Sequence, residues 1–377
     1  MKPAERAREL FRRHFGTDPV AVASAPGRVN LVGEHVDNFG GHVLPMATGW
    51  RTAVAVGPGH AAFRAISEQQ GPIQADWPAA PQGHWSDYVA GVASLDSPLT
   101  SPWSEGLCAA VASDVPTGAG LSSSAALEVA TGFALSAWAG RSIDPAARAD
   151  LAWRTETGFV GMPCGRMDQI ASARATPGEA MLLDCRTLGI ESVPVRLDVV
   201  IAESGESHAL RDSSYADRRR DCDNALAIIR GQLPGIEYLT DIPPARLNEV
   251  AGRLPAPLDR RVKHVVNENQ RTLLAAQALA AGDVRAFGLL VGQSHNSLRD
   301  NYECSTPRLD AIVSAARAVA GVRGARLVGA GWGGSVLVVC DSGAGADVAA
   351  RLRADATLAL PLVSVVEAGG GAALETD

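Results

Sequence analysis

The stretch Val115-Pro-Thr-Gly-Ala-Gly-Leu-Ser-Ser-Ser-Ala-Ala126 decides how this chain is interpreted. It is rich in glycine and serine and runs into the apolar segment 125–139, which predicts a loop that leads into the N-terminus of a helix. Small residues let backbone N–H groups approach an anion, and a helix N-terminus favours negative charge. The loop has no Walker lysine, so it is not a P-loop. We expect phosphate binding by Gly118, Ala119, Gly120, Leu121, Ser122, Ser123 and Ser124, with a serine-capped helix as the structural alternative.

Upstream of this loop, the segment Gly27-Arg-Val-Asn-Leu-Val-Gly-Glu-His-Val-Asp37 concentrates donors and acceptors in one strand and turn. Carboxylates accept hydrogen bonds from sugar hydroxyls, and an arginine can hold a phosphate. The pattern therefore suits a polyol site. A solvated turn with charged residues on its outer face explains the segment equally well. The candidate binding residues are Arg28, Glu34, His35 and Asp37.

Downstream, the segment Gly161-Met-Pro-Cys-Gly-Arg-Met-Asp-Gln169 places one acidic residue, Asp168, in a turn rich in glycine. A carboxylate on a rigid turn beside a phosphate loop can accept a hydroxyl proton during phosphoryl transfer. The alternative is that Asp168 caps the short helix expected at 169–173. Phosphoryl transfer also needs a divalent metal, for which a serine hydroxyl and a carboxylate are normal Mg²⁺ ligands. Ser124 and Glu156 could supply them, although both also fit a helix surface.

The composition of the whole chain restricts its function. It has 377 residues, of which 46% are hydrophobic and 20% charged, as in a globular protein of roughly two domains of about 100–200 residues each. The net charge of −7 argues against nucleic-acid binding through a broad basic surface. The only lysines are Lys2 and Lys263, so a mechanism that needs a catalytic lysine has almost no candidates. The six scattered cysteines lack zinc-site spacing, which fits a reducing cytoplasm. We expect no signal peptide, because the N-terminal segment 1–15 is charged throughout, and no membrane span, because the most apolar stretch is short and Glu128 interrupts it.

Local patterns predict mixed helices and strands that do not alternate with the regular period of a barrel or solenoid. A boundary near residue 195 divides the chain into domains 1–195 and 196–377. We expect loops at 71–83 and 97–105, and Gly158 to end the helix that Asp144 begins. The helices are expected near 4–15, 145–157, 169–173, 216–229, 260–281 and 309–319, and the strands near 20–22, 29–32, 43–44, 52–56, 180–183, 192–195, 324–328 and 335–340.

Taken together, the three clusters resemble the galactokinases, members of the GHMP family of small-molecule kinases. The N-terminal signature of that family is similar to Gly27–Asp37 followed by Gly40-Gly41 and Val43-Leu-Pro45, and its ATP loop is similar to Pro116–Ala126. Its third, C-terminal glycine motif resembles Leu327-Val-Gly-Ala-Gly-Trp-Gly-Gly334. Further similar segments follow in the family's order, so the resemblance covers nearly the whole chain: Trp85–Val89, Leu182–Arg186, Ser213–Tyr215, His264–Asn269 and Ser294–Tyr302.

The resemblance implies an α+β, two-domain GHMP-kinase fold with the active site in the cleft between domains. It further implies that Asp168 is the catalytic base and that Arg28 stabilises charge on the transferring phosphoryl group. ATP would be the co-substrate, with Mg²⁺ held by Ser124 and Glu156. The loop Gly118–Ser124 would wrap the ATP phosphates, and Gly329–Gly334 would help to close the site. The sugar would be lined by Glu34, His35, Asp37, Gly165 and Tyr215.

The expected reaction is phosphorylation of the anomeric hydroxyl of α-D-galactose to galactose 1-phosphate, in the Leloir route into glycolysis. A related sugar such as N-acetylgalactosamine or arabinose is the alternative substrate, and a galactose and ATP sensor without turnover is the alternative function. We expect a cytoplasmic monomer with small-molecule partners and neither nucleic acid nor membrane as a partner. The usual Glu-His-Thr-Asp-Tyr-Asn motif has three departures, which bear on the choice of sugar: Val36, Asn38 and Phe39.

Overall fold

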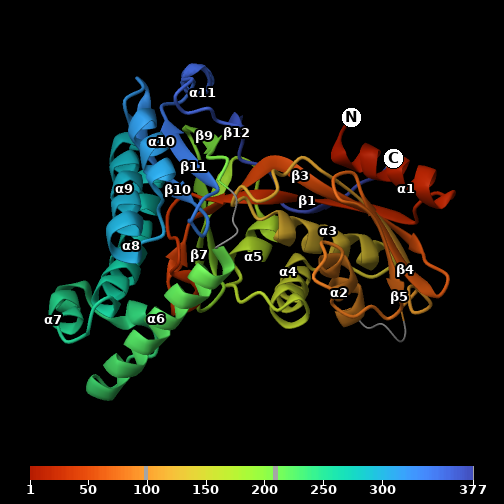
Figure 1. Cartoon of the computed structure of the whole chain (residues 1–377), viewed down its shortest axis with the longest axis horizontal. Helices are drawn as coiled ribbons and strands as arrows, with labels where there is room; N and C mark the ends of the chain where they lie inside the picture. Colours follow the sequence, from red (N-terminus) through yellow and green to blue (C-terminus); the bar gives the residue numbers. More distant parts are fainter. Residues whose placement is uncertain (97–100, 207–210, 377) are drawn as a thin grey trace.

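The computed structural model describes residues 1–96, 101–206 and 211–376, with side chains omitted at 211–213. Within these ranges two lobes lie side by side along the long axis of the molecule (Figure 1). The first lobe contains a six-stranded sheet, and the second contains a four-stranded sheet with a group of helices beside it. A three-stranded sheet of β2 (His42–Val43), β7 (Glu179–Asp184) and β8 (Ile190–Pro194) adjoins the first lobe. The GHMP-kinase fold class predicted from the sequence is mixed α and β, and the structure agrees.

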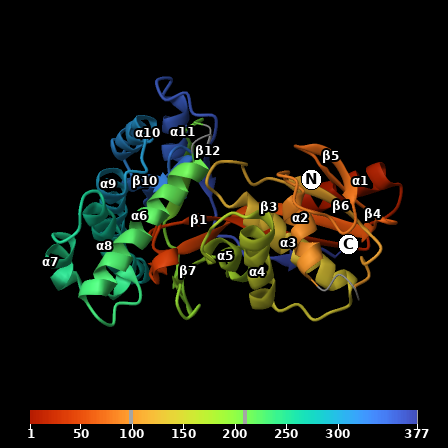
Figure 2. The same cartoon turned by 60° about the horizontal axis from the view of Figure 1, so that its bottom comes forward.

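The six-stranded sheet has the order β13-β1-β3-β6-β4-β5. Helix α1 (Pro3–Phe15) packs on β3 and β6, while α3 (Ser123–Trp138) packs on β1 and β3. The chain's last strand, β13, pairs with β1, so both termini lie on the first lobe (Figure 2). The strands are β1 (Ala21–Asn30), β3 (Pro45–Pro58), β4 (Ala62–Ser67), β5 (Gly71–Asp76), β6 (Leu107–Ser113) and β13 (Ala373–Leu374).

Strand β1 differs from the sequence prediction in a way that matters for the site. Two short strands were expected, but one strand runs through both, with a shift of register between Pro26 and Arg28. The phosphate loop approaches this point closely, because the N–H of Arg28 donates to the carbonyl of Leu121 over 3.0 Å. A Cβ at Gly27 would lie 2.7 Å from the same carbonyl oxygen, so glycine is needed here.

The remaining helices of the first lobe lie beneath its sheet and carry much of the site (Figure 1). They are α2 (Asp87–Leu95), α4 (Pro145–Arg154) and α5 (Met167–Arg174). The predicted stop at Gly158 is wrong, because α4 continues as a π-helical turn (Thr155–Val160) that ends at the left-handed Gly161. The loop predicted at 71–83 is also wrong in part, since β5 occupies residues 71–76 and pairs with β4. Residues 97–100 of the predicted loop 97–105 lie outside the described ranges.

The four-stranded sheet of the second lobe has the order β10-β11-β9-β12. Its central strand β11 (Ser335–Cys340) is buried along its whole length, as the apolar sequence predicts. The other strands are β9 (Asp198–Glu203), β10 (Val322–Val328) and β12 (Val363–Val366). The predicted boundary at 195 falls between β8 and β9, and the division into domains at that residue stays a prediction.

The sequence analysis did not predict three helices of the second lobe: α7 (Leu247–Ala251), α9 (Val284–Ser297) and α11 (Gly345–Ala354). Helix α9 packs on β10 and α8. Gly288 and Gly292 lower its intrinsic helix propensity, so its stability depends on this packing. The predicted helices of this lobe are present as α6 (Arg211–Gln232), α8 (Leu258–Ala280) and α10 (Pro307–Arg317). No helix within the described residues is long and apolar enough to cross a bilayer.

Candidate active site

A cavity of about 310 Å³ lies where the three glycine-rich segments meet. All the residues predicted for catalysis or for binding sugar, ATP or metal line this cavity except Ala119, which is buried in the core. Segments far apart in the chain contribute to its wall, including β1, the phosphate loop, the turn before α5, α6 and the third glycine loop. The wall also includes residues that the sequence analysis did not assign: Tyr88, Met162, Pro163, Cys164 and Met167.

The phosphate loop adopts left-handed backbone conformations at Gly118 (φ 78°), Gly120 (φ 79°) and Ser122 (φ 58°). These turns lead the chain to the N-terminus of α3 at Ser123, and Ser123 and Ser124 of this first turn line the cavity. Ser122 occupies the cap position but makes no side-chain cap bond. Its hydroxyl donates instead to Oδ2 of Asp168. The serine-cap alternative is therefore not what Ser122 does.

Asp168 is held from two sides. Arg28 Nε donates to Oδ1 over 2.8 Å and Arg28 Nη2 to Oδ2 over 3.0 Å, a bidentate pair that fixes the plane of the carboxylate. Arg28 is itself 4% exposed and donates from Nη1 to the carbonyl of Gly120 over 2.7 Å. The cap of α5 is Arg166, so Asp168 in the first turn is not the capping residue. A carboxylate in this fixed orientation can accept a proton from a bound hydroxyl.

Ser124 and Glu156 lie next to each other on the cavity wall. Ser124 Oγ donates to Glu156 Oε1 over 2.9 Å, and Gln169 Nε2 donates to Oε2. Burial raises the pKa of Glu156 to about 7, and the charge of Asp168 adds to the effect. Nearby, burial and the charge of Glu156 raise the pKa of Glu128 well above its usual range. A hydroxyl and a carboxylate are the oxygen ligands that Mg²⁺ prefers, and a divalent cation would offset this crowding of carboxylates.

The predicted sugar residues form a second part of the wall. Asp37 lies against Gly165, where a Cβ would overlap the Asp37 carboxylate. Burial, together with the charges of Asp168 and Glu34, raises the pKa of Asp37 to about 6. His35 has a left-handed backbone (φ 63°) and donates from Nε2 to the carbonyl of Ala330 over 3.0 Å. The Tyr215 ring lies 5.7 Å from that of His35.

The three departures from the usual motif have separate explanations. Val36 and Phe39 are buried in the hydrophobic core and do not line the cavity. Asn38 makes polar contacts, because its Nδ2 donates to the hydroxyl of Tyr215 over 3.0 Å. Asn38 is therefore the departure whose side chain is hydrogen-bonded to a residue of the candidate sugar site.

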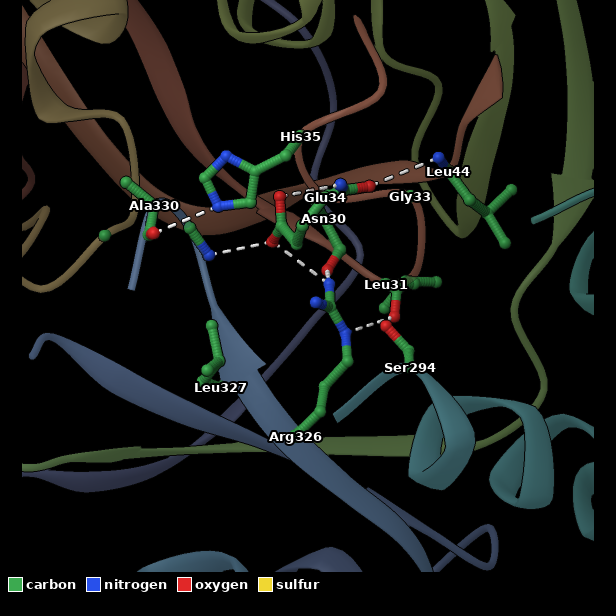
Figure 3. Close-up of polar contacts among 12 residues, drawn as sticks. Asn30, Leu31, Gly33, Glu34, His35, Leu44, Ser294, Arg326, Leu327 and Ala330 are labelled. Atoms are coloured by element: carbon green, nitrogen blue, oxygen red, sulfur yellow. Dashed lines mark hydrogen bonds and ion pairs between the residues drawn. The ribbon is translucent and has the colours of Figure 1, made fainter. Parts of the chain in front are cut away.

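Glu34 lines the cavity, but both of its carboxylate oxygens already accept hydrogen bonds from other residues of the protein (Figure 3). Its Oε1 accepts from the N–H of Gly329 over 2.8 Å and from Arg326 Nη2 over 3.1 Å. Its Oε2 accepts from Asn30 Nδ2 over 3.0 Å. Arg326 is fully buried on β10 and also donates from Nε to the carbonyl of Leu31 over 2.9 Å. Glu34 thus ties the end of β1 to the third glycine loop.

Sequence reasoning missed the role of Arg326. It lies 292 residues from Glu34, and nothing in the local sequence of its strand distinguishes it from the exposed Arg323 or indicates a partner. The third glycine loop was expected near the site, and the structure brings Gly329 and Ala330 to the cavity.

Comparison with known proteins places these features in one family. The galactose-binding signature of galactokinases matches residues 9–58, the N-terminal domain of GHMP kinases matches 87–175, and their C-terminal domain matches 275–357. Human galactokinase is 41% identical over 353 residues, covering 90% of this chain and 88% of the human protein. The galactokinase of Roseiflexus sp. is 40% identical over 333 residues, covering 87% of this chain and 85% of that protein.

The same family appears among solved structures. The crystal structure of Lactococcus lactis galactokinase complexed with galactose superimposes with a TM-score of 0.88 at 30% identity. The match covers 97% of this chain and 98% of the Lactococcus chain. Motifs, domain models, relatives and fold agree, and the chain therefore belongs to the galactokinases, within the GHMP kinase family.

Proposed function

We propose that this protein transfers the γ-phosphoryl group of ATP to the anomeric hydroxyl of α-D-galactose, with Asp168 as the base. Membership of the galactokinases gives the reaction class, ATP-dependent phosphorylation of galactose. The observation that carries the residue assignment is the bidentate pair between Arg28 and Asp168, beside the phosphate loop and in one cavity with Asp37, Gly165 and Tyr215.

Asp168 accepts the proton of the attacking hydroxyl, or orients that hydroxyl toward the phosphorus atom. Its carboxylate needs no large movement, because Arg28 and Ser122 already fix both oxygens. Arg28 lies between Asp168 and Gly120 of the phosphate loop, so its positive charge is close to both the base and the region of the phosphates. It stabilises negative charge that spreads over the transferring group.

ATP is bound through the backbone N–H groups of Gly118–Ser124 and the N-terminus of α3. Mg²⁺, when bound, would neutralise charge on the phosphates and so favour transfer of the phosphoryl group. Ser124 and Glu156 are the residues that would hold it, and their oxygen chemistry fits this ion. The side chain of Ala119 packs in the core, so this residue would contribute to ATP binding through its backbone alone.

Galactose is bound by His35, Asp37, Gly165 and Tyr215. Glu34 supports this site by holding the N–H of Gly329 in the third glycine loop. We assign the cavity to the cleft between domains, because its wall combines residues before 195 with Tyr215, Gly329 and Ala330. Exclusion of water from such a cleft favours transfer to the sugar over hydrolysis of ATP. A cytoplasmic monomer stays a prediction, and the six free cysteines are compatible with a reducing compartment.

The test is an ADP-release assay with Mg²⁺ and ATP over galactose, 2-deoxygalactose, N-acetylgalactosamine, glucose, arabinose and talose. Strong turnover with galactose that the Asp168→Asn variant lacks is the expected result. Preference for another sugar would keep the kinase chemistry and change the substrate. Binding of galactose without turnover would overturn the proposed function in favour of a sensor.

A further inference from the structure

Asn38 occupies a central position among the sugar-site residues. Its side-chain Nδ2 lies 3.0 Å from the hydroxyl of Tyr215 and 3.3 Å from Oδ1 of Asp37. Its Oδ1 accepts from Nη1 of Arg219 over 3.0 Å. Tyr215 and Arg219 are four residues apart on α6, so they lie on the same face of that helix and Asn38 contacts both.

These partners determine the orientation of the Asn38 side-chain amide, that is, which side its oxygen and its nitrogen face. A guanidinium only donates hydrogen bonds, so the amide oxygen must face Arg219. The amide NH₂ then faces the Asp37 carboxylate, which accepts when it is ionised. The same NH₂ group faces the Tyr215 hydroxyl, which must therefore accept from it. The opposite orientation would place a carbonyl oxygen against a carboxylate and an NH₂ against a guanidinium.

This arrangement sets the direction of the hydrogen bonds that remain for a sugar. The Tyr215 hydroxyl oxygen accepts from Asn38 Nδ2, so its own O–H proton is left to donate toward the cavity that it lines. Asp37 receives both the N–H and the Nδ2 of Asn38 at Oδ1. Its Oδ2, which lies beside Gly165, is left to accept.

We infer that Asn38 is a positioning residue that fixes Tyr215 as a donor and Asp37 as an acceptor toward the sugar. The site then recognises a sugar that presents one hydroxyl as a donor to Asp37 and one hydroxyl oxygen as an acceptor for Tyr215. The inference rests on the proposed sugar-binding role of Asp37 and Tyr215. It assigns a purpose to one of the departures from the usual galactokinase motif.

The first experiment compares three variants with wild type. Asn38→Leu removes the amide, Asn38→Asp replaces the NH₂ donor with an acceptor, and Tyr215→Phe removes the hydroxyl. Each should raise KM for galactose about 3- to 10-fold, the value of one net hydrogen bond, with kcat changed less than about 2-fold. Asn248→Leu on α7, an exposed asparagine, is the matched control and should leave both constants unchanged.

The direction of the Tyr215 hydrogen bond is tested with modified sugars. Galactoses are used that carry hydrogen or fluorine in place of the hydroxyl at C2, C3, C4 or C6, because fluorine accepts but does not donate. At the carbon that Tyr215 contacts, wild type should use the fluoro sugar better than the deoxy sugar. This difference should vanish in Tyr215→Phe and in Asn38→Asp, where the Tyr215 proton turns toward the new carboxylate. A purely structural defect would lower activity on all sugars alike.

The double variant Asn38→Leu, Tyr215→Phe completes the design. If Asn38 acts through the Tyr215 hydroxyl, Asn38→Leu should raise KM less in the Tyr215→Phe background than in wild type. Equal effects in both backgrounds, or an unchanged fluoro preference in Asn38→Asp, would overturn the inference. If Tyr215→Phe itself leaves KM for galactose unchanged, the proposed sugar-binding role of Tyr215 fails instead.

Discussion

The buried ion pair between Glu34 and Arg326 allows a quantitative prediction about stability. The Arg326 side chain is 0% exposed and that of Glu34 is 4% exposed. Arg326→Met keeps much of the apolar volume but removes the charge and the donors to Glu34, Leu31 and Asn30. The Glu34 carboxylate would then remain buried, with Gly329 N–H and Asn30 Nδ2 as its remaining donors.

Removing one partner of a buried ion pair costs about 3–5 kcal/mol, because the other charge is left uncompensated. A typical folding free energy is about 5–15 kcal/mol, so the change is a large part of the total. With a urea dependence of about 3 kcal/mol per M, the unfolding midpoint should fall by about 1–2 M. The double variant Glu34→Met, Arg326→Met should recover part of this, because no charge is then left buried.

The assay is equilibrium urea unfolding followed by tryptophan fluorescence, with an unchanged slope as the sign that stability alone has changed. Arg323→Met is the matched control, since Arg323 lies three residues earlier on β10 and pairs with Asp341 at the surface. An exposed pair of this kind contributes little, so the control midpoint should stay close to wild type. If Arg326→Met lowers the midpoint no more than Arg323→Met does, the Glu34–Arg326 pair does not hold β1 and the third glycine loop together.

Three substitutions and one pH profile test the reacting groups and the sugar site. Asp168→Asn should lower kcat about 10²–10⁴-fold while calorimetry still detects galactose binding, and near-normal kcat would remove Asp168 as the base. Arg28→Lys keeps the charge but loses the bidentate contact, so only part of the wild-type kcat should remain, and full activity would mean that charge alone suffices. The pKa of Asp37 is about 6, so protonation below that pH removes its free acceptor and KM for galactose should rise; a flat profile from pH 5 to 7 would contradict this. Gly165→Ala should raise KM for galactose but not for ATP, because the new methyl group displaces the Asp37 carboxylate, and an unchanged KM for galactose would show that Asp37 moves at no cost.

Much of the site could be predicted because its signals are local. Glycine and serine at Gly118–Ser124 specify the turn and the helix start within a few residues of each other. The acidic residues of the segments Gly27–Asp37 and Gly161–Gln169 likewise lie in short stretches whose chemistry can be recognised from the sequence. The structure brings these clusters to one cavity, while their roles in catalysis stay predictions for the experiments above.

Where local prediction failed, contacts from elsewhere in the fold had decided the outcome. Gly158 is a helix breaker by propensity, but a π-helical turn carries the chain past it and brings Glu156 to Ser124. Helix α9 contains two glycines and forms because β10 and α8 cover it. Residues 71–76 form a strand because β4 supplies the hydrogen-bond partners.

The sequence by itself determined the three glycine-rich motifs, the mixed α and β class and the family, because each of these depends on residue type and order along the chain. Only the tertiary structure decided that Glu34 binds Arg326, that Ser122 donates to Asp168 and that Asn38 links Tyr215 with Asp37. Each of these pairs joins a short motif to a residue outside it, and one joins residues 292 positions apart. A hydrogen bond depends on distance and direction in space, which local propensity does not encode, so these contacts exist together only in the folded chain.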